Sequence, residues 1–77
     1  MKFKTESGSV YTLDHGTMGW SRVRSSQSGN IRREFGTLLD WPTVKVGEMV
    51  FLHDSRNQPK CSHHFVKTSA VTEIISQ

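Results

Sequence analysis

Apolar residues in this 77-residue chain occur only in short stretches, and residues that form turns separate them. The longest uninterrupted apolar run is the four residues Met49 to Leu52. A transmembrane helix needs about 20 consecutive apolar residues, so the sequence predicts no membrane-spanning helix. The chain also contains 17 Ser and Thr residues, and its apolar set is dominated by β-branched and aromatic side chains. Both properties favour strands over helices, and the sequence therefore predicts an all-β fold.

The alternation of side chains and the turn residues indicate where the strands lie. The expected strands are residues 2–5, 9–13, 20–24, 44–46, 49–53, 64–67 and 70–75. The first two form a hairpin around residues 6–8, and the apolar stretch 49–53 is expected to be buried on both faces. Short strands with regular spacing predict a small five- to six-stranded barrel or sandwich, either SH3-like or OB-like.

Residues 31–39 allow two interpretations. Ile31, Phe35 and Leu38 have helical spacing, which favours one or two helical turns. Gly36 lies within the segment and Pro42 follows it, which favours an ordered loop instead. The predicted fold therefore contains at most one short helical turn.

The size of the chain limits its core. We expect residues 1–77 to form a single domain, which buries only about 60% of the surface that the unfolded chain exposes. Oligomerisation is a common source of the missing stability, so we expect a homo-oligomer. The single cysteine, Cys61, excludes an internal disulfide, and residues 1–6 lack the apolar stretch of a signal peptide. These features predict a protein of the reducing cytoplasm.

The net charge of +3 is concentrated in one segment. Residues 20–33 contain four arginines and no acidic residue, whereas the rest of the chain is close to neutral. Trp20, Arg22 and Arg24 share one strand face by period-two alternation, and Arg32 and Arg33 follow a loop rich in Ser and Gly at residues 25–30. Guanidinium groups match phosphate geometry and Trp can stack on a base, so this segment predicts an anion site. The alternative is a solvated strand face whose Arg stems cover apolar surface.

Further residues complete the predicted site. Tyr11 offers a second stacking surface, and residues near the last strand offer polar contacts from a neighbouring strand or a second subunit. The predicted ligand-binding residues are Tyr11, Trp20, Arg22, Arg24, Arg32, Arg33, His64, Lys67, Thr68 and Ser69.

The sequence supports neither a metal site nor an enzyme. Cys61, His63 and His64 are residue types that bind zinc, but a structural zinc site needs four ligands and no second pair stands at a recognisable spacing. Cys61 beside His63 lacks an orienting group, and the chain contains none of the common catalytic motifs. We therefore expect a binding protein without metal or cofactor.

Three short segments of the sequence resemble segments of small proteins from bacteriophages and prophages. Residues 5–11 with Asp14 resemble their SGS-x-Y…D opening hairpin. In those proteins this hairpin is followed by a W/R-x-R motif and a Ser/Gly loop. Residues 44–50 resemble their V-x-V-G-x-x-L/V element, and residues 67–74 resemble their T-S-x-V-x-x-I closing strand.

This resemblance implies roles in phage defence evasion. Small phage proteins include sponges that sequester nucleotide-derived immune signals, usually within homo-oligomers, and anti-CRISPR proteins that bind an effector directly. We therefore expect a non-enzymatic sponge for a small anionic nucleotide in the host cytoplasm. The alternatives are an inhibitor of a host protein, a structural phage protein, and a nucleic-acid-binding barrel. The basic residues lie on no amphipathic helix, so we expect no membrane partner.

Overall fold

The computed structural model describes residues 1–25, 31–55 and 64–77, with the backbone alone described at residues 25, 31–33 and 64. These residues form seven strands, whereas the predicted barrel or sandwich has five or six. The strands are β1 Lys2–Thr5, β2 Val10–Asp14, β3 Gly19–Ser25, β4 Ile31–Thr37, β5 Phe51–Asp54, β6 His64–Lys67 and β7 Val71–Ser76. The all-β prediction is confirmed for the described residues, which contain no helix and hence none able to cross a membrane.

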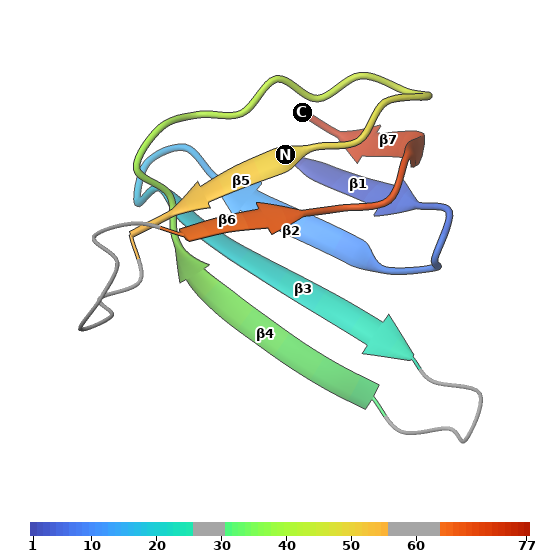
Figure 1. Ribbon diagram of the computed structural model, residues 1–77, viewed down its shortest axis with the longest axis horizontal. Helices are drawn as coiled ribbons and strands as arrows, with labels where there is room; N and C mark the ends of the chain where they lie inside the picture. The colour runs from blue at the N-terminus through green and yellow to red at the C-terminus, as the bar shows by residue number, and fades with distance from the viewer. Residues whose placement is uncertain (26–30, 56–63) are drawn as a thin grey trace.

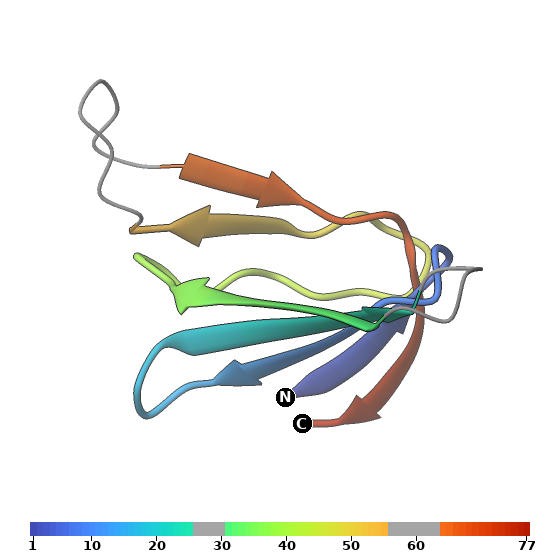
Figure 2. The same cartoon turned by 90° about the horizontal axis from the view of Figure 1, so that it is seen from below.

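The strands build two antiparallel sheets (Figure 1). One sheet has five strands in the order β4-β3-β2-β1-β7, and the other is the hairpin β5–β6. The hairpin lies over one face of the five-stranded sheet (Figure 2). Among the described residues the strands close no barrel, so the barrel form of the prediction is not found.

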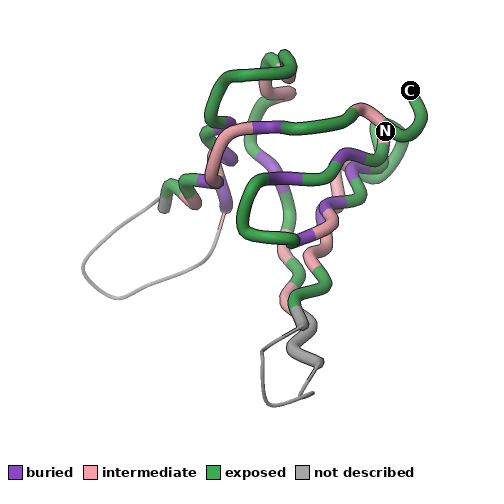
Figure 3. Tube along the Cα trace, turned by 90° about the vertical axis from the view of Figure 1, so that its right-hand side faces the viewer, coloured by how far each residue is buried: buried purple, intermediate pink, exposed green. Residues whose placement is uncertain are grey.

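Core side chains fill the space between the two layers. Buried residues alternate with exposed ones along β1, as expected for a sheet with one covered face (Figure 3). The expected opening hairpin is confirmed, since Phe3 pairs with Tyr11 across β1 and β2. The core consists of Phe3, Tyr11, Leu13, Trp20, Leu38, Val50, Leu52 and Val71.

Backbone hydrogen bonds connect the two sheets at both ends. At one end the chain beyond β4 meets β5, where the Leu39 amide donates to the His53 carbonyl at 2.7 Å. At the other end the segment before β5 meets β7, where the Gly47 amide donates to the Val71 carbonyl at 2.8 Å and Val46 forms a parallel bridge with Val71. The relative position of the layers is therefore set by long-range contacts.

The segment 31–39 is neither helix nor loop over most of its length. Residues 31–37 form β4, which pairs with β3 in register from Gly19↔Thr37 to Ser25↔Ile31. The helical spacing was misleading because Phe35 does not enter the core but lies exposed on the sheet. Tertiary pairing has overridden the local pattern.

Two other expectations about strands are wrong. Residues 44–46 form no strand, and only Val46 makes a single bridge. The stretch 49–53 is buried on one face alone, with Val50 and Leu52 inside and Phe51 outside. The reason is that β5 lies in the outer layer, so only one of its faces meets the other sheet.

Candidate functional site

Arg22 is already paired within the sheet. The register of β3 and β4 places Glu34 opposite Arg22, and the two side chains form a close ion pair. A second guanidinium nitrogen, Nη1, donates to the Tyr11 hydroxyl at 3.0 Å, and the Arg22 side chain is only 13% exposed. Residues 20–33 contain no acidic residue, yet Arg22 has an acidic partner, because Glu34 follows this segment directly and the pairing of β3 with β4 places it opposite Arg22.

Trp20 and Tyr11 belong to the core rather than to a ligand surface. The Trp20 indole Nε1 donates to a carboxylate oxygen of buried Asp54 at 3.0 Å. The buried Tyr11 ring stacks on Phe3, with ring centroids 5.1 Å apart. Neither ring can stack on a base, because both side chains are buried in the core.

The remaining arginines lie toward the free end of the β3–β4 ribbon, which projects beyond the hairpin β5–β6 (Figure 1). Arg24 is exposed there, and its backbone pairs with that of Arg32, while Arg33 pairs with Val23. The side chains of Arg32, Arg33 and His64 lie outside the described residues. So do the loop at residues 26–30 and the pair Cys61 and His63.

Thr68 and Ser69 hold the fold together. The Thr68 hydroxyl is buried, accepts a hydrogen bond from the Val50 amide at 3.0 Å and donates to the Ser69 carbonyl at 2.7 Å. The Ser69 hydroxyl accepts from the Ser7 amide and donates to the Ser7 hydroxyl, which links the first turn to β7. Thr68 is therefore not available to a ligand, contrary to expectation.

Lys67 lies on an exposed surface whose other residues were not among the predicted ligand-binding residues. The outer surface of β5 and β6 carries Phe51, His53, Phe65 and Lys67, and we call it the hairpin face. Phe51 and Phe65 are 54% and 52% exposed. Lys67 Nζ lies 6.0 Å from the centre of the Phe51 ring, and the His53 and Phe65 rings stack at 4.3 Å.

His53 is oriented by a further contact, a hydrogen bond at 3.3 Å between its Nδ1 and the Asp40 carboxylate. The signal for the hairpin face was present in the sequence. Phe51 and His53 alternate with buried Val50 and Leu52, which marks a strand with one exposed aromatic side. The hairpin face was not predicted, because residues 49–53 were expected to be buried on both faces.

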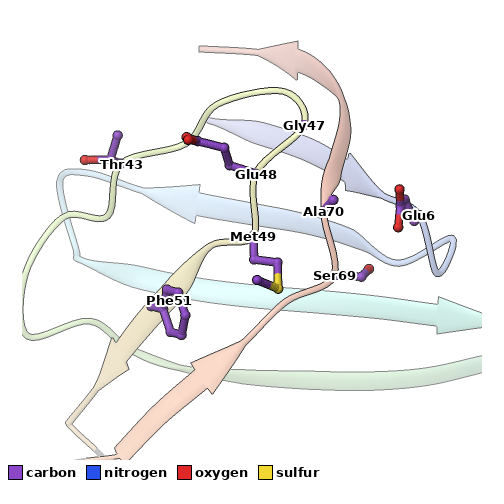
Figure 4. A pocket seen from close by; sticks show the side chains of 8 residues that line it. All are labelled: Glu6, Thr43, Gly47, Glu48, Met49, Phe51, Ser69 and Ala70. Carbon is purple, nitrogen blue, oxygen red and sulfur yellow. The ribbon is translucent and has the colours of Figure 1, made fainter.

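A hollow of about 800 Å³ lies beside the hairpin face, near Phe51 at the start of β5 (Figure 4). Phe51 belongs to both surfaces, and Ser69 alone of the predicted residues lines the hollow. We call it the acidic hollow, because its charged residues are two glutamates. Its lining consists of Glu6, Thr43, Gly47, Glu48, Met49, Phe51, Ser69 and Ala70.

The structure thus distributes the predicted residues over separate places. Arg24 lies on the ribbon, Lys67 on the hairpin face and Ser69 at the hollow, while Tyr11, Trp20, Arg22 and Thr68 make internal contacts. Within the described ranges no group of three or more His, Cys, Asp or Glu residues is placed to hold a metal ion. No family model, curated protein or solved structure matches the chain.

Proposed function

We propose that this protein is a non-enzymatic binding protein for an anionic, nucleotide-derived ligand, and that the hairpin face receives it. One observation carries the proposal: two half-exposed phenylalanine rings share a surface with the ammonium group of Lys67. A base can stack on an exposed aromatic ring, and a neighbouring ammonium can contact a phosphate. Both interactions bind a ligand without a reacting side chain.

The charges around the face agree with this role. Among the described residues Lys67 forms no ion pair, so its charge is free to meet an anion. Phe51 and Phe65 also expose apolar surface to water, which is unfavourable in free energy. A ligand that covers this surface would remove that cost. The resemblance to phage proteins extends the proposal to a sponge for a nucleotide immune signal in the host cytoplasm.

Calorimetry with ADP-ribose and a panel of cyclic dinucleotides tests the proposal. We expect one of them to bind, Lys67→Gln to weaken it about tenfold and Phe65→Leu to weaken it by a similar factor. Phe65→Leu keeps an apolar side chain but removes the ring, and with it both stacking on a base and the contact with His53. Lys45→Gln is the matched control, because Lys45 is an exposed lysine outside the face.

The variants also distinguish the hairpin face from the β3–β4 ribbon as the place where the ligand binds. Equal weakening by Lys45→Gln would point to net charge alone. No heat with any nucleotide at micromolar protein would remove the proposal. If Arg24→Gln abolished binding while Lys67→Gln had no effect, the site would be the ribbon and not the hairpin face.

A second candidate is a single strand of nucleic acid. It is favoured by the exposure of Phe51 and Phe65, whose rings lie about half-exposed on the outer surface of the β5–β6 sheet. Fluorescence anisotropy with oligothymidylates of increasing length distinguishes it. An affinity that rises with oligonucleotide length and falls steeply with salt concentration indicates single-stranded nucleic acid. A site for a compact nucleotide should instead bind a mononucleotide most tightly.

A further inference from the structure

The acidic hollow has a lining unlike that of the hairpin face. Its sides come from the segment Gly47–Met49 and from Ser69 and Ala70, with Thr43 at one end and Glu6 at the other (Figure 4). The Met49 side chain lies between these walls, toward Phe51 and Ser69. The hollow is thus apolar at its centre and polar at its ends.

Backbone contacts make the hollow a built feature of the fold. The Gly47 amide donates to the Val71 carbonyl at 2.8 Å, and the Val71 amide donates to the Glu48 carbonyl at 2.9 Å. On the opposite side the Glu6 amide donates to the Ala70 carbonyl at 2.9 Å. Glu6 and Glu48 are therefore both held by main-chain bonds to the same short segment, residues 70–71.

The charges of the hollow are uncompensated. Within the described part of the chain no basic residue lines it, and neither Glu6 nor Glu48 forms an ion pair. Its volume of about 800 Å³ lies in the range of small-ligand sites, about 300–1,000 Å³. Two carboxylates would repel a phosphate, so the hollow does not extend the anion site of the hairpin face.

We infer that the acidic hollow is a second binding site, which takes an organic cation: an ammonium or guanidinium group on an apolar body of side-chain size. The apolar body packs against Met49 and Phe51, while the cation lies at the carboxylates of Glu6 or Glu48. The hydroxyl groups of Thr43 and Ser69 offer acceptors for further N–H groups. Such a cation occurs as a free amine and as a lysine or arginine side chain.

NMR titration of the ¹⁵N-labelled protein with two matched pairs of probes tests the site. The first pair is phenethylamine and the uncharged 2-phenylethanol, and the second is Nα-acetyl-lysine methylamide and its norleucine analogue. We expect each amine to shift the amides of Gly47, Met49 and Ala70, and each neutral partner to bind at least about threefold more weakly. The tighter of the two amines identifies the source as a free or a peptide-borne cation.

Glutamate variants assign the charge. We expect Glu6→Gln and Glu48→Gln to weaken amine binding about threefold each and about tenfold together. Glu73→Gln, on the exposed part of β7 and outside the lining, is the control and should leave the affinity unchanged. The Glu6→Gln/Glu48→Gln double variant should keep its nucleotide affinity, and Lys67→Gln should keep its amine affinity, which separates the two sites.

Three results would overturn the inference. One is the absence of amide shifts at about 10 mM amine, a concentration well above the dissociation constant expected of a specific site. Another is equal binding of an amine and its neutral partner. The third is unchanged amine binding in a double variant whose amide spectrum shows the native fold.

Discussion

Trp20 and Asp54 join the two sheets through one buried hydrogen bond. The indole nitrogen belongs to the five-stranded sheet, the carboxylate belongs to the hairpin β5–β6, and both residues are almost fully buried. Gly36, beside Trp20 on the neighbouring strand, leaves the space in which the two groups meet. A buried polar pair of this kind stabilises one arrangement of the layers, because each group would lose its partner in any other.

Gly36→Ala should destabilise the protein. A Cβ at this position would lie 2.6 Å from Trp20 Nε1 and closer still to the Asp54 carboxylate, so one of them must move. Overpacking of this kind costs about 1–3 kcal/mol, although alanine is otherwise preferred to glycine in a strand. Urea unfolding measures the loss. Gly16→Ala in an exposed turn is the control, with an expected change within about 0.5 kcal/mol. Equal free energies of unfolding for the two variants would show that the core beside Trp20 accommodates the added methyl group.

At the scale of elements, the β3–β4 ribbon determines the environments of Trp20, Arg22 and Arg24. Alternation in the sequence correctly placed Trp20, Arg22 and Arg24 on one strand, but not in one environment. The strand passes from beneath the hairpin β5–β6 to its own projecting end, so Trp20 is buried, Arg22 is largely buried and Arg24 is exposed. Local pattern shows which side chains share a face, and the length of the covering layer determines which of them meet water.

The Arg22–Glu34 pair should show measurable coupling. A double-mutant cycle of Arg22→Gln and Glu34→Gln in urea unfolding should give a coupling of about 0.5–1 kcal/mol. The value is modest because the Glu34 side chain is 39% exposed and solvent screens the pair. Raising the salt concentration should reduce it. Strictly additive effects of the two substitutions would show that the contact contributes nothing to stability.

At the scale of the whole molecule, much apolar surface remains exposed. Three of the four phenylalanines are at least half-exposed, and Phe35 on the edge strand β4 is 79% exposed. The large hydrophobic residues exposed on the described surface are Val23, Phe35, Leu39, Val46, Met49, Phe51, Phe65 and Ile75. An edge strand with free backbone groups and an exposed ring is a natural site for a second chain, so the homo-oligomer stays a prediction.

Phe35→Lys should shift the protein toward the monomer. A charge on the edge strand opposes pairing with another chain, and the exposed side chain makes few internal contacts to lose. Sedimentation equilibrium at micromolar concentration should give a multiple of 8.8 kDa for the native chain and a smaller mass for the variant. Ile75→Lys, exposed on the opposite edge strand β7, should not change the mass. A native chain that sediments as a monomer would end the prediction.

The sequence alone identified the all-β class, the opening hairpin, and the strands near residues 2–5, 9–13, 20–24, 49–53, 64–67 and 70–75. These depend on alternation and turn residues, which act within a few positions of the chain. The roles of individual side chains depend on partners far along it. Trp20 bonds to a residue 34 positions away, and Ser7 bonds to one 62 positions away. Register and layer contacts over such separations carry no local signature, so the pairing of Arg22, the burial of Trp20 and the existence of the hairpin face emerged only when the sheets were assembled.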